Sequence, residues 1–286
     1  NGDGKSDILW RRQTEGAYSV WFMDGINRLG DADMDASRDL NWQVGGIADF
    51  NSDGNADVLW RNNATGESRL VLMNNMNVRE YKSLDTVADP NMRIAAVGDY
   101  NGNGQLEVLW RDARENRSRL WHMNGLAKAA EEDLGAIKDS SNLIADTGKA
   151  SAGMDFDNDG NSDILWHDSI DGENYVWLMN GTNYNGGVFL APVSDLDWKI
   201  VAAADFNADT KADLVRQQAG GALGVWLLNN GVLQSSGGFG TIGNDWRIVA
   251  VADFNGDGKA DLLWRTTTGV TALWLMNGAA APTSAG

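Results

Sequence analysis

A nine-residue acidic run recurs along this chain and constrains its fold more than any other feature. In Asp253–Asp261, of sequence DFNGDGKAD, positions 1, 3, 5 and 9 carry side-chain oxygens and positions 4 and 6 are glycine. Complete copies span Asp49–Asp57, Asp99–Glu107, Asp155–Asp163, Asp205–Asp213 and Asp253–Asp261, and a sixth, cut copy opens the chain at Asn1–Asp7. Successive copies lie 50, 50, 56, 50 and 48 residues apart. A nearly fixed period of this length predicts a repeat architecture.

Each period contains four short runs in a constant order. An apolar run such as Arg247–Ala252 precedes the acidic loop, and Asp261–Arg265 follows it. A third run, Thr271–Met276, ends at an Asn-Gly turn, and a more polar fourth segment such as Val232–Ile242 completes the period. Short runs rich in Val, Ile, Leu and Trp, separated by Gly, Asn and Asp, are typical of strands. Four strands per repeat predict an all-β fold, a β-propeller of four-stranded antiparallel blades. Six blades fit the copy number best, with seven as the alternative.

The repeats favour one propeller domain over residues 1–286. The first strand of the first copy and the fourth strand of the last have no clear counterpart, because the tail Ala279–Gly286 is short and bland. The sequence therefore predicts a fragment of a longer protein, truncated at both ends. Six extra residues around Ser140–Lys149 predict an irregular loop, and Leu126–Glu132 could form a helical turn.

The acidic loops predict metal binding. Closely spaced carboxylates repel one another unless a cation lies among them, and hard oxygen ligands suit Ca²⁺. An EF-hand also uses positions 1, 3 and 5, but it needs a Glu at position 12, where this chain has Trp60, Trp110, Trp166 and Trp264. The EF-hand interpretation therefore fails. The alternative is an Asx-rich turn without metal, but several such turns with two to four carboxylates each favour Ca²⁺.

The run D-F-N-G-D-G-K-A-D, followed by L-L-W-R and L-W-L-M-N-G, resembles the FG-GAP/VCBS repeats of β-propellers. These repeats are related to the propeller of integrin α-subunits and occur in secreted and surface proteins of bacteria. The resemblance covers essentially the whole chain. It implies Ca²⁺ in the loops between the first and second strands of a blade, with ligands from the side chains at positions 1, 3, 5 and 9 and the carbonyl at position 7.

The implied ligands are Asp49, Asn51, Asp53, Asn55 and Asp57; Asp99, Asn101, Asn103, Gln105 and Glu107; Asp155, Asp157, Asp159, Asn161 and Asp163; Asp205, Asn207, Asp209, Lys211 and Asp213; and Asp253, Asn255, Asp257, Lys259 and Asp261.

Three copies depart from this pattern. The Asp99 loop has only two carboxylates and should bind Ca²⁺ more weakly. Thr210 replaces the glycine at position 6 and is expected to strain its turn. The first copy lacks position 1 and keeps Asn1, Asp3 and Asp7.

Charge and composition exclude several classes of protein. A net charge of −17 without a visible basic face argues against nucleic acid as a partner. The chain has no cysteine, which excludes disulfides and thiol chemistry. It also has no run of eighteen apolar residues, so membrane insertion through a helix is not expected.

The recurring tryptophan pairs 10/21, 110/121 and 166/177 are expected to pack between blades. Trp42, Trp198 and Trp246, at strand starts, are better ligand candidates, although core packing is the favoured role for them too. Arg216 replaces the recurring tryptophan and predicts a locally different packing. The two histidines, His122 and His167, show no partnered nucleophile in the sequence.

Together these features predict a calcium-stabilised, non-catalytic binding or adhesion propeller that recognises glycans or protein surfaces. We expect it in an extracellular or cell-surface, multidomain bacterial protein. The alternative is a catalytic or accessory domain of a calcium-dependent polysaccharide lyase, and a plain scaffold is a third reading.

Overall fold

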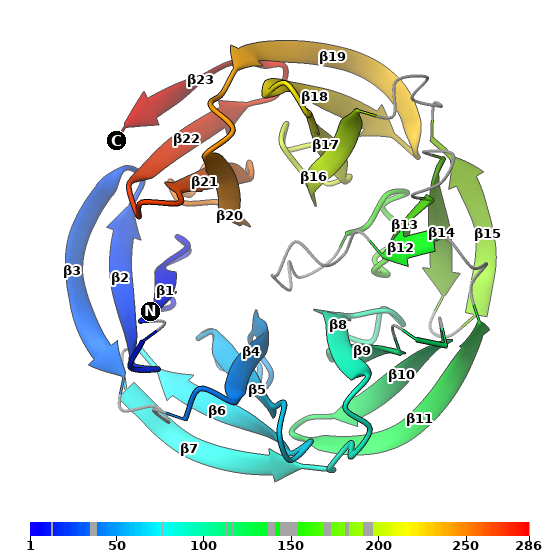
Figure 1. Cartoon of the computed structure of the whole chain (residues 1–286). Helices are drawn as coiled ribbons and strands as arrows, with labels where there is room; N and C mark the ends of the chain where they lie inside the picture. The colour runs from blue at the N-terminus through cyan, green and yellow to red at the C-terminus, as the bar shows by residue number, and fades with distance from the viewer. Residues whose placement is uncertain are drawn as a thin grey trace. The chain divides into compact units, whose positions relative to one another are not determined.

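The computed structural model describes residues 1–12, 14–34, 39–75, 77–112, 114–115, 117–136, 141–143, 154–168, 173–180, 183–190 and 197–285. All of its regular elements are strands, and the described residues contain no helix. The strands form six antiparallel sheets, each built from strands that are consecutive in the chain (Figure 1). The chain divides into two compact units, at the connection between the third and fourth sheets.

The first unit holds three sheets. The first has three strands and the other two have four. Their bounds are β1 (Ile8–Arg11), β2 (Tyr18–Asp24) and β3 (Asn27–Met34); β4 (Trp42–Ala48), β5 (Asp57–Asn62), β6 (Ser68–Asn74) and β7 (Asn77–Leu84); and β8 (Met92–Gly98), β9 (Glu107–Asp112), β10 (Arg117–Asn124) and β11 (Ala127–Ala136).

The second unit holds three four-stranded sheets. Their bounds are β12 (Ser141–Leu143), β13 (Ile164–Asp168), β14 (Asn174–Asn180) and β15 (Asn183–Phe189); β16 (Trp198–Ala204), β17 (Asp213–Gln218), β18 (Ala222–Asn229) and β19 (Val232–Thr241); and β20 (Trp246–Ala252), β21 (Asp261–Thr266), β22 (Thr271–Asn277) and β23 (Ala280–Ala285).

The sequence-based fold is confirmed: the chain is an all-β propeller with six blades, one per repeat. Within each unit, consecutive blades share an apolar core. Leu70 and Leu72 of the second blade pack with Val108 and Trp110 of the third. In the other unit, one core joins the fourth blade to the fifth, and another joins the fifth to the sixth. Because both faces of such strands are covered, runs such as Ile200–Ala204 are apolar throughout instead of alternating.

Two predictions about individual segments were wrong. The expected helical turn at Leu126–Glu132 lies largely in strand β11, which pairs with β10 over its full length. The alanines, lysine and glutamates of this segment favour a helix locally, but pairing to β10 overrides that preference. The tail that seemed too short for a fourth strand is β23, which pairs with β22. A terminal strand can be held by main-chain hydrogen bonds alone and needs few apolar side chains.

The expected insertion at Ser140–Lys149 lies mostly outside the described residues, which include only the short strand β12 there. The first sheet has three strands, as expected from the missing first run. That residues 1–286 form one domain, and that the chain is a truncated fragment, remain predictions. No helix in the described part of the chain is long and apolar enough to cross a membrane.

Candidate metal centre

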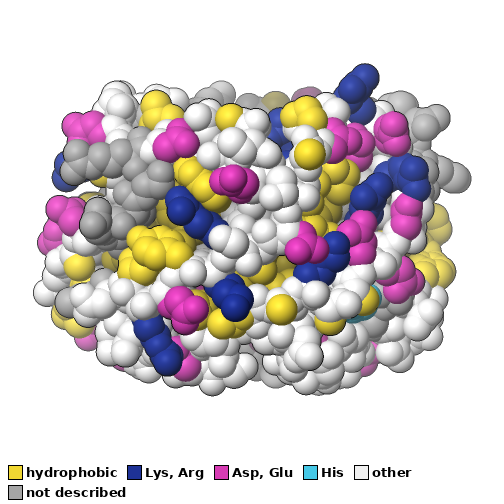
Figure 2. All heavy atoms as spheres, turned by 90° about the horizontal axis from the view of Figure 1, so that it is seen from below, with side chains coloured by type: hydrophobic (Ala, Val, Ile, Leu, Met, Phe, Trp, Pro, Cys, Tyr) yellow, Lys and Arg dark blue, Asp and Glu magenta, His cyan; other side chains and the backbone are white. Residues whose placement is uncertain are grey.

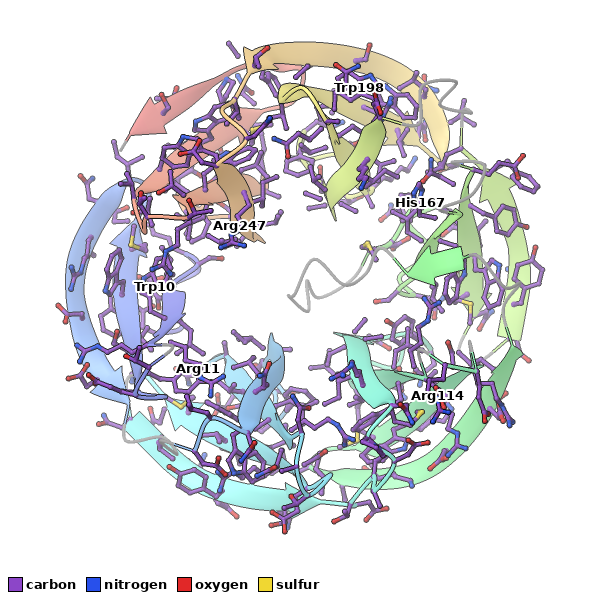
Figure 3. The ribbon with its side chains drawn as sticks, in the orientation of Figure 1. Trp10, Arg11, Arg114, His167, Trp198 and Arg247 are labelled. Atoms are coloured by element: carbon purple, nitrogen blue, oxygen red, sulfur yellow. The ribbon has the colours of Figure 1, made fainter. Side chains whose placement is uncertain are left out.

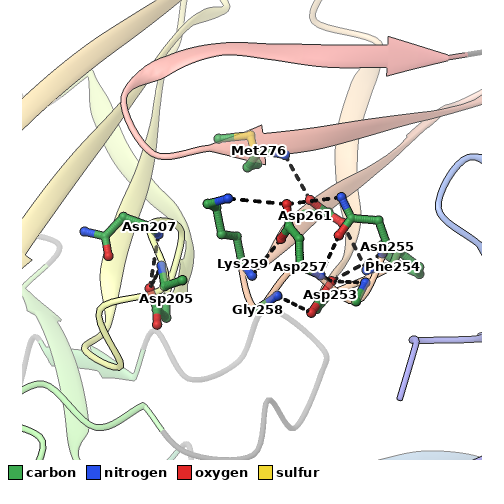
Figure 4. Close-up of polar contacts among 12 residues, drawn as sticks. Asp205, Asn207, Asp253, Phe254, Asn255, Asp257, Gly258, Lys259, Asp261 and Met276 are labelled. Atoms are coloured by element: carbon green, nitrogen blue, oxygen red, sulfur yellow. Dashed lines mark hydrogen bonds and ion pairs between the residues drawn. The ribbon is translucent and has the colours of Figure 1, made fainter. Parts of the chain in front are cut away.

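The carboxylate at position 9 of each acidic loop is buried at the start of the second strand. Asp57, Asp213 and Asp261 are 0% exposed. In Asp261, Oδ2 accepts the backbone N–H of Phe254 at 3.0 Å and Oδ1 accepts the N–H of Met276 at 2.9 Å (Figure 4). Asp57, Asp163 and Asp213 make the same two bonds in their own blades. This side chain therefore ties the loop to the third strand.

The residue that donates this second bond lies where the third strand pairs irregularly with the fourth. The register between the third and fourth strands shifts directly before Met73, Met179 and Leu228, and beside Met276. In the second blade the skipped residue is Arg79 on the fourth strand. The N–H of Met73 lies two residues beyond the last pair of the β5–β6 ladder, and there the position-9 carboxylate accepts it. Sequence reasoning treated position 9 only as a metal ligand and missed this structural role. Each carboxylate oxygen has a second lone pair, so accepting an N–H leaves capacity for a cation.

The acidic residue at position 1 shapes the loop itself. Asp253 Oδ2 accepts the N–H of Gly258 at 2.8 Å, and its Oδ1 accepts that of Asp257 at 3.2 Å. The equivalent bond to position 6 recurs in the other four complete loops. The side chains at positions 3 and 5 accept N–H groups two residues further on, as Asx turns do. The loop thus turns its oxygen atoms inward.

Positions 4 and 6 have left-handed backbone in every complete loop. Glycine adopts this conformation without cost, but Thr210 stands at position 6 with a φ of 72°. A β-branched residue is strained there. The strain that the sequence predicted at Thr210 is therefore confirmed.

In three loops the side chain at position 7 reaches the turn after the third strand, whereas Lys259 lies 3.4 Å from Asp257 of its own loop. Asn55 Oδ1 accepts the N–H of Asn75, and Gln105 Oε1 accepts the N–H of Gly125. Lys211 Nζ donates to Asn229 Oδ1. Any long polar side chain can make such a contact, which explains why position 7 varies among the repeats. A metal contact from this position would use the backbone carbonyl, as the resemblance implies.

The Asp155 loop gathers the most negative charge. Carboxylate oxygens of Asp155, Asp157 and Asp159 lie within 4.8 Å of one another. Burial, followed by the neighbouring charge of Asp159, raises the pKa of Asp157. All four other complete loops have Asn at position 3. The amide of this Asn can offset charge, because Asn207 Nδ2 donates to Asp209 at 3.1 Å. The donor set of the Asp155 loop fits a hard cation such as Ca²⁺.

The Asp99 loop differs in charge, as expected. Asn103 replaces the aspartate that the other complete loops have at position 5, and Glu107 stands at position 9, fully buried. Glu107 Oε1 lies 3.7 Å from Nδ1 of His122. The other ring nitrogen of His122, Nε2, lies 3.7 Å from Glu132 Oε2. The first copy keeps the structural bond, because Asp7 Oδ1 accepts the N–H of Met23.

Neighbouring acidic loops are bonded to one another in the second unit. The N–H of Ala212, at position 8 of one loop, donates to the carbonyl of Asp155, at position 1 of the preceding loop, at 2.9 Å. Ala260 makes the same bond to Asp205 at 2.8 Å. Each of these loops is therefore in direct main-chain contact with the loop before it.

Residues 49–110, 155–216 and 205–264 each match the family model for an FG-GAP-like repeat, and together they cover more than half of the chain. The chain belongs to the FG-GAP-like repeat family. The three matched segments include all five complete acidic loops. A comparison with the sequences of curated proteins found no match.

Solved structures share the fold of these FG-GAP-like repeats. A chain in the crystal structure of a nidogen/laminin complex is 14% identical, with a TM-score of 0.56, and the match covers 94% of this chain and 89% of that one. A protein from Lactobacillus plantarum is 12% identical, with a TM-score of 0.57 and coverages of 99% and 82%. At these identities the likeness concerns the fold alone.

The tryptophan pairs of the FG-GAP-like repeats pack against each other. Ring centroids lie 5.0 Å apart in Trp10/Trp21, 4.7 Å in Trp110/Trp121 and 5.0 Å in Trp166/Trp177. Each pair packs within one sheet, and Trp110 and Trp121 also belong to the core that the second and third blades share, as expected. Packing between blades stays a prediction for the other two pairs.

The tryptophans at strand starts are partly covered. The Arg69 guanidinium lies 3.8 Å from the ring centroid of Trp42, which is 8% exposed. Trp198, at the start of β16 (Figure 3), is half-buried with Arg216 beside it, and Arg216 also lies 3.8 Å from the Trp226 ring. Arg216 therefore packs against two indoles of its own blade, and the locally different blade interface expected there stays a prediction. On β13, His167 Nδ1 lies 2.9 Å from Asn174 Oδ1.

Acidic and basic side chains are interspersed on the face shown in Figure 2.

Proposed function

We propose that this chain is a calcium-stabilised, non-catalytic binding module that recognises a glycan or a protein surface. The observation that carries the calcium part is the Asp155 loop, where oxygens of three carboxylates lie within 4.8 Å of one another and a fourth carboxylate, Asp163, is buried at position 9. Asp155, Asp157, Asp159 and Asp163 would hold the ion together with the Asn161 carbonyl. The other four complete loops would hold further ions through the same positions.

The ion would supply charge neutralisation at the junction of two strands. Without it, repulsion among the loop carboxylates opposes the turn that the position-1 side chain enforces. A structural role of this kind needs no open coordination position. The family membership supports a binding or adhesion role, and a setting outside the cell, where calcium concentrations suit modules of low affinity.

Calorimetric titration of chelator-stripped protein with CaCl₂ tests the metal. We expect several ions per chain. Asp159→Asn should weaken one site at least tenfold, because it removes a carboxylate from the most charged loop. Asp245→Asn, an exposed aspartate outside the loops, should change nothing. Protein that takes up no calcium would show that the loops are Asx turns only.

A glycan array probed with and without calcium tests recognition. Binding that depends on calcium-stabilised folding should be lost in chelator and recovered when calcium is restored. Incubation with acidic polysaccharides provides the contrary test. Appearance of unsaturated products absorbing in the ultraviolet would contradict a non-catalytic role.

A further inference from the structure

A cavity of about 530 Å³ lies in the first unit, away from the acidic loops. One wall is the connection from β7 to β8, with Asp85, Val87 and Asp89. The opposite wall is the β8–β11 sheet, with Arg119 of β10 and Lys128 and Glu131 of β11. Ligand pockets commonly enclose about 300–1,000 Å³, so the cavity has the size of a small-molecule site. It includes none of the predicted calcium ligands.

The charged side chains of the sheet wall are already paired with one another. Glu131 accepts hydrogen bonds from Arg119 at 3.1 Å, from Lys128 at 2.8 Å and from Trp121 Nε1 at 3.1 Å. The hydrogen bond from Lys128 holds the pKa of Glu131 below its usual value. Lys128 also lies 3.3 Å from Asp85 on the facing wall. The cavity is therefore lined by ionised groups whose positions are fixed by mutual contacts.

The connection that forms the other wall is held from beneath by Arg61. This buried guanidinium, 4% exposed, donates to the carbonyls of Val87 at 3.0 Å and Asp89 at 3.1 Å. The N–H of Val87 in turn donates to the carbonyl of Gly66 at 2.9 Å. A wall that is ordered before a ligand arrives reduces the conformational entropy lost on binding.

The lining selects the chemistry of the ligand. It contains three basic and five acidic side chains, so an anion would meet a net negative charge and a simple cation would meet three fixed cations. An apolar ligand would remove water from these charges without replacing its hydrogen bonds, which is unfavourable. A neutral molecule with many hydroxyl groups avoids these costs. Each hydroxyl can donate to a carboxylate such as Glu131 and accept from Arg119 or Lys128.

We propose that this cavity binds an uncharged sugar residue of a glycan through hydrogen bonds to its hydroxyl groups. The proposal rests on the binding function proposed above and gives it a place and a ligand class. Recognition is polar and not by ring stacking, because Trp121 is only 2% exposed. Arg119 and Glu131 are the specificity-determining residues.

Saturation-transfer NMR and calorimetry in calcium buffer test the site, with neutral gluco-, xylo- and manno-oligosaccharides and with oligogalacturonate as the charged comparison. At least one neutral series should bind, and oligogalacturonate should bind at least tenfold more weakly. Arg119→Ala and Glu131→Ala should each reduce affinity at least tenfold. The matched control is Arg69→Ala. Arg69 lies opposite Trp60 on the neighbouring strand, as Arg119 lies opposite Trp110, but Arg69 does not line the cavity. The affinity of the Arg69→Ala variant for the saccharide should stay within twofold of that of the unaltered protein.

Melting curves of all variants with calcium confirm that each is folded. A folded protein that binds calcium but no neutral saccharide overturns the cavity proposal and leaves the calcium site standing. Saccharide binding that Arg119→Ala and Glu131→Ala leave unchanged places recognition elsewhere and also overturns it. Tighter binding of oligogalacturonate would contradict the charge argument.

Discussion

At the scale of single residues, the same backbone conformation is unstrained in one acidic loop and strained in another, depending on the residue at position 6. Thr210 takes a left-handed backbone that four other loops assign to glycine. A non-glycine residue in that region destabilises the folded state by on the order of 1–2 kcal/mol. Glycine would remove this strain, but it also raises the conformational entropy of the unfolded chain, which offsets part of the stabilisation. Thr210→Gly should therefore stabilise the protein by about 0.5–1 kcal/mol in urea unfolding. A loss of stability would contradict the strain.

The buried position-9 carboxylates predict an unusual pH dependence. Burial raises the pKa of Asp163 and Asp213 to about 7 and that of Asp57 and Asp261 to about 6, against two backbone N–H bonds that oppose the shift. A raised folded-state pKa contributes stability at low pH that is lost as pH rises through that value. Chelated protein should therefore be less stable at pH 8 than at pH 5, by about 1 kcal/mol or more per site.

Melting curves in chelator between pH 5 and pH 8 measure this, and calcium should flatten the profile because the ion favours the ionised carboxylate. The exposed Asp53 is the internal control. Hydrogen bonds from Asn55 lower its pKa, so this carboxylate stays ionised across the window and adds nothing to the change. Stability in chelator that rises from pH 5 to pH 8 would contradict the prediction.

At the scale of elements, the turn between β5 and β6 is fitted tightly to the connection between β7 and β8. Gly66 has a φ of 77°, and a Cβ there would lie 2.2 Å from the carbonyl oxygen of Val87. Gly125, in the turn between β10 and β11, has a φ of 56° but open space around it. Both glycines therefore have a left-handed backbone conformation, but only Gly66 is closely packed against another segment.

Gly66→Ala should therefore cost about 3 kcal/mol or more, because backbone must move in addition to the left-handed strain. Gly125→Ala should cost only the strain, about 1–2 kcal/mol. Urea unfolding of both variants in one calcium concentration measures the difference. Equal losses would show that the connection adapts freely to a methyl group at Gly66.

At the scale of the whole molecule, stability is expected to depend on calcium through repetition. A ligand at a hundredfold excess over its Kd contributes about 2.7 kcal/mol per site, whereas an ordinary domain has about 5–15 kcal/mol in total. Chelation should lower the melting temperature by ten degrees or more, and Ca²⁺ should restore it better than Mg²⁺, which prefers fewer ligands at shorter distance. An unmoved melting curve would contradict calcium stabilisation.

The sequence by itself determined the repeat, the strand order in each blade and the position of the acidic loops. These follow from local chemistry: apolar runs form strands, and Asp, Asn and Gly form turns. It also indicated strain at Thr210, because glycine stands at that position in the other loops.

Only the tertiary structure decided what depends on contacts between distant segments. Strands β11 and β23 form because β10 and β22 offer main-chain groups to pair with. The side chains of β11 and β23 do not by themselves favour a strand. The second role of the position-9 carboxylate depends on a backbone N–H of the third strand, fifteen residues away in the fifth and sixth blades. The cavity beside Arg119 forms where one blade's connection meets the next sheet. Pairing and packing across such separations set these features, and no local pattern in the sequence encodes them.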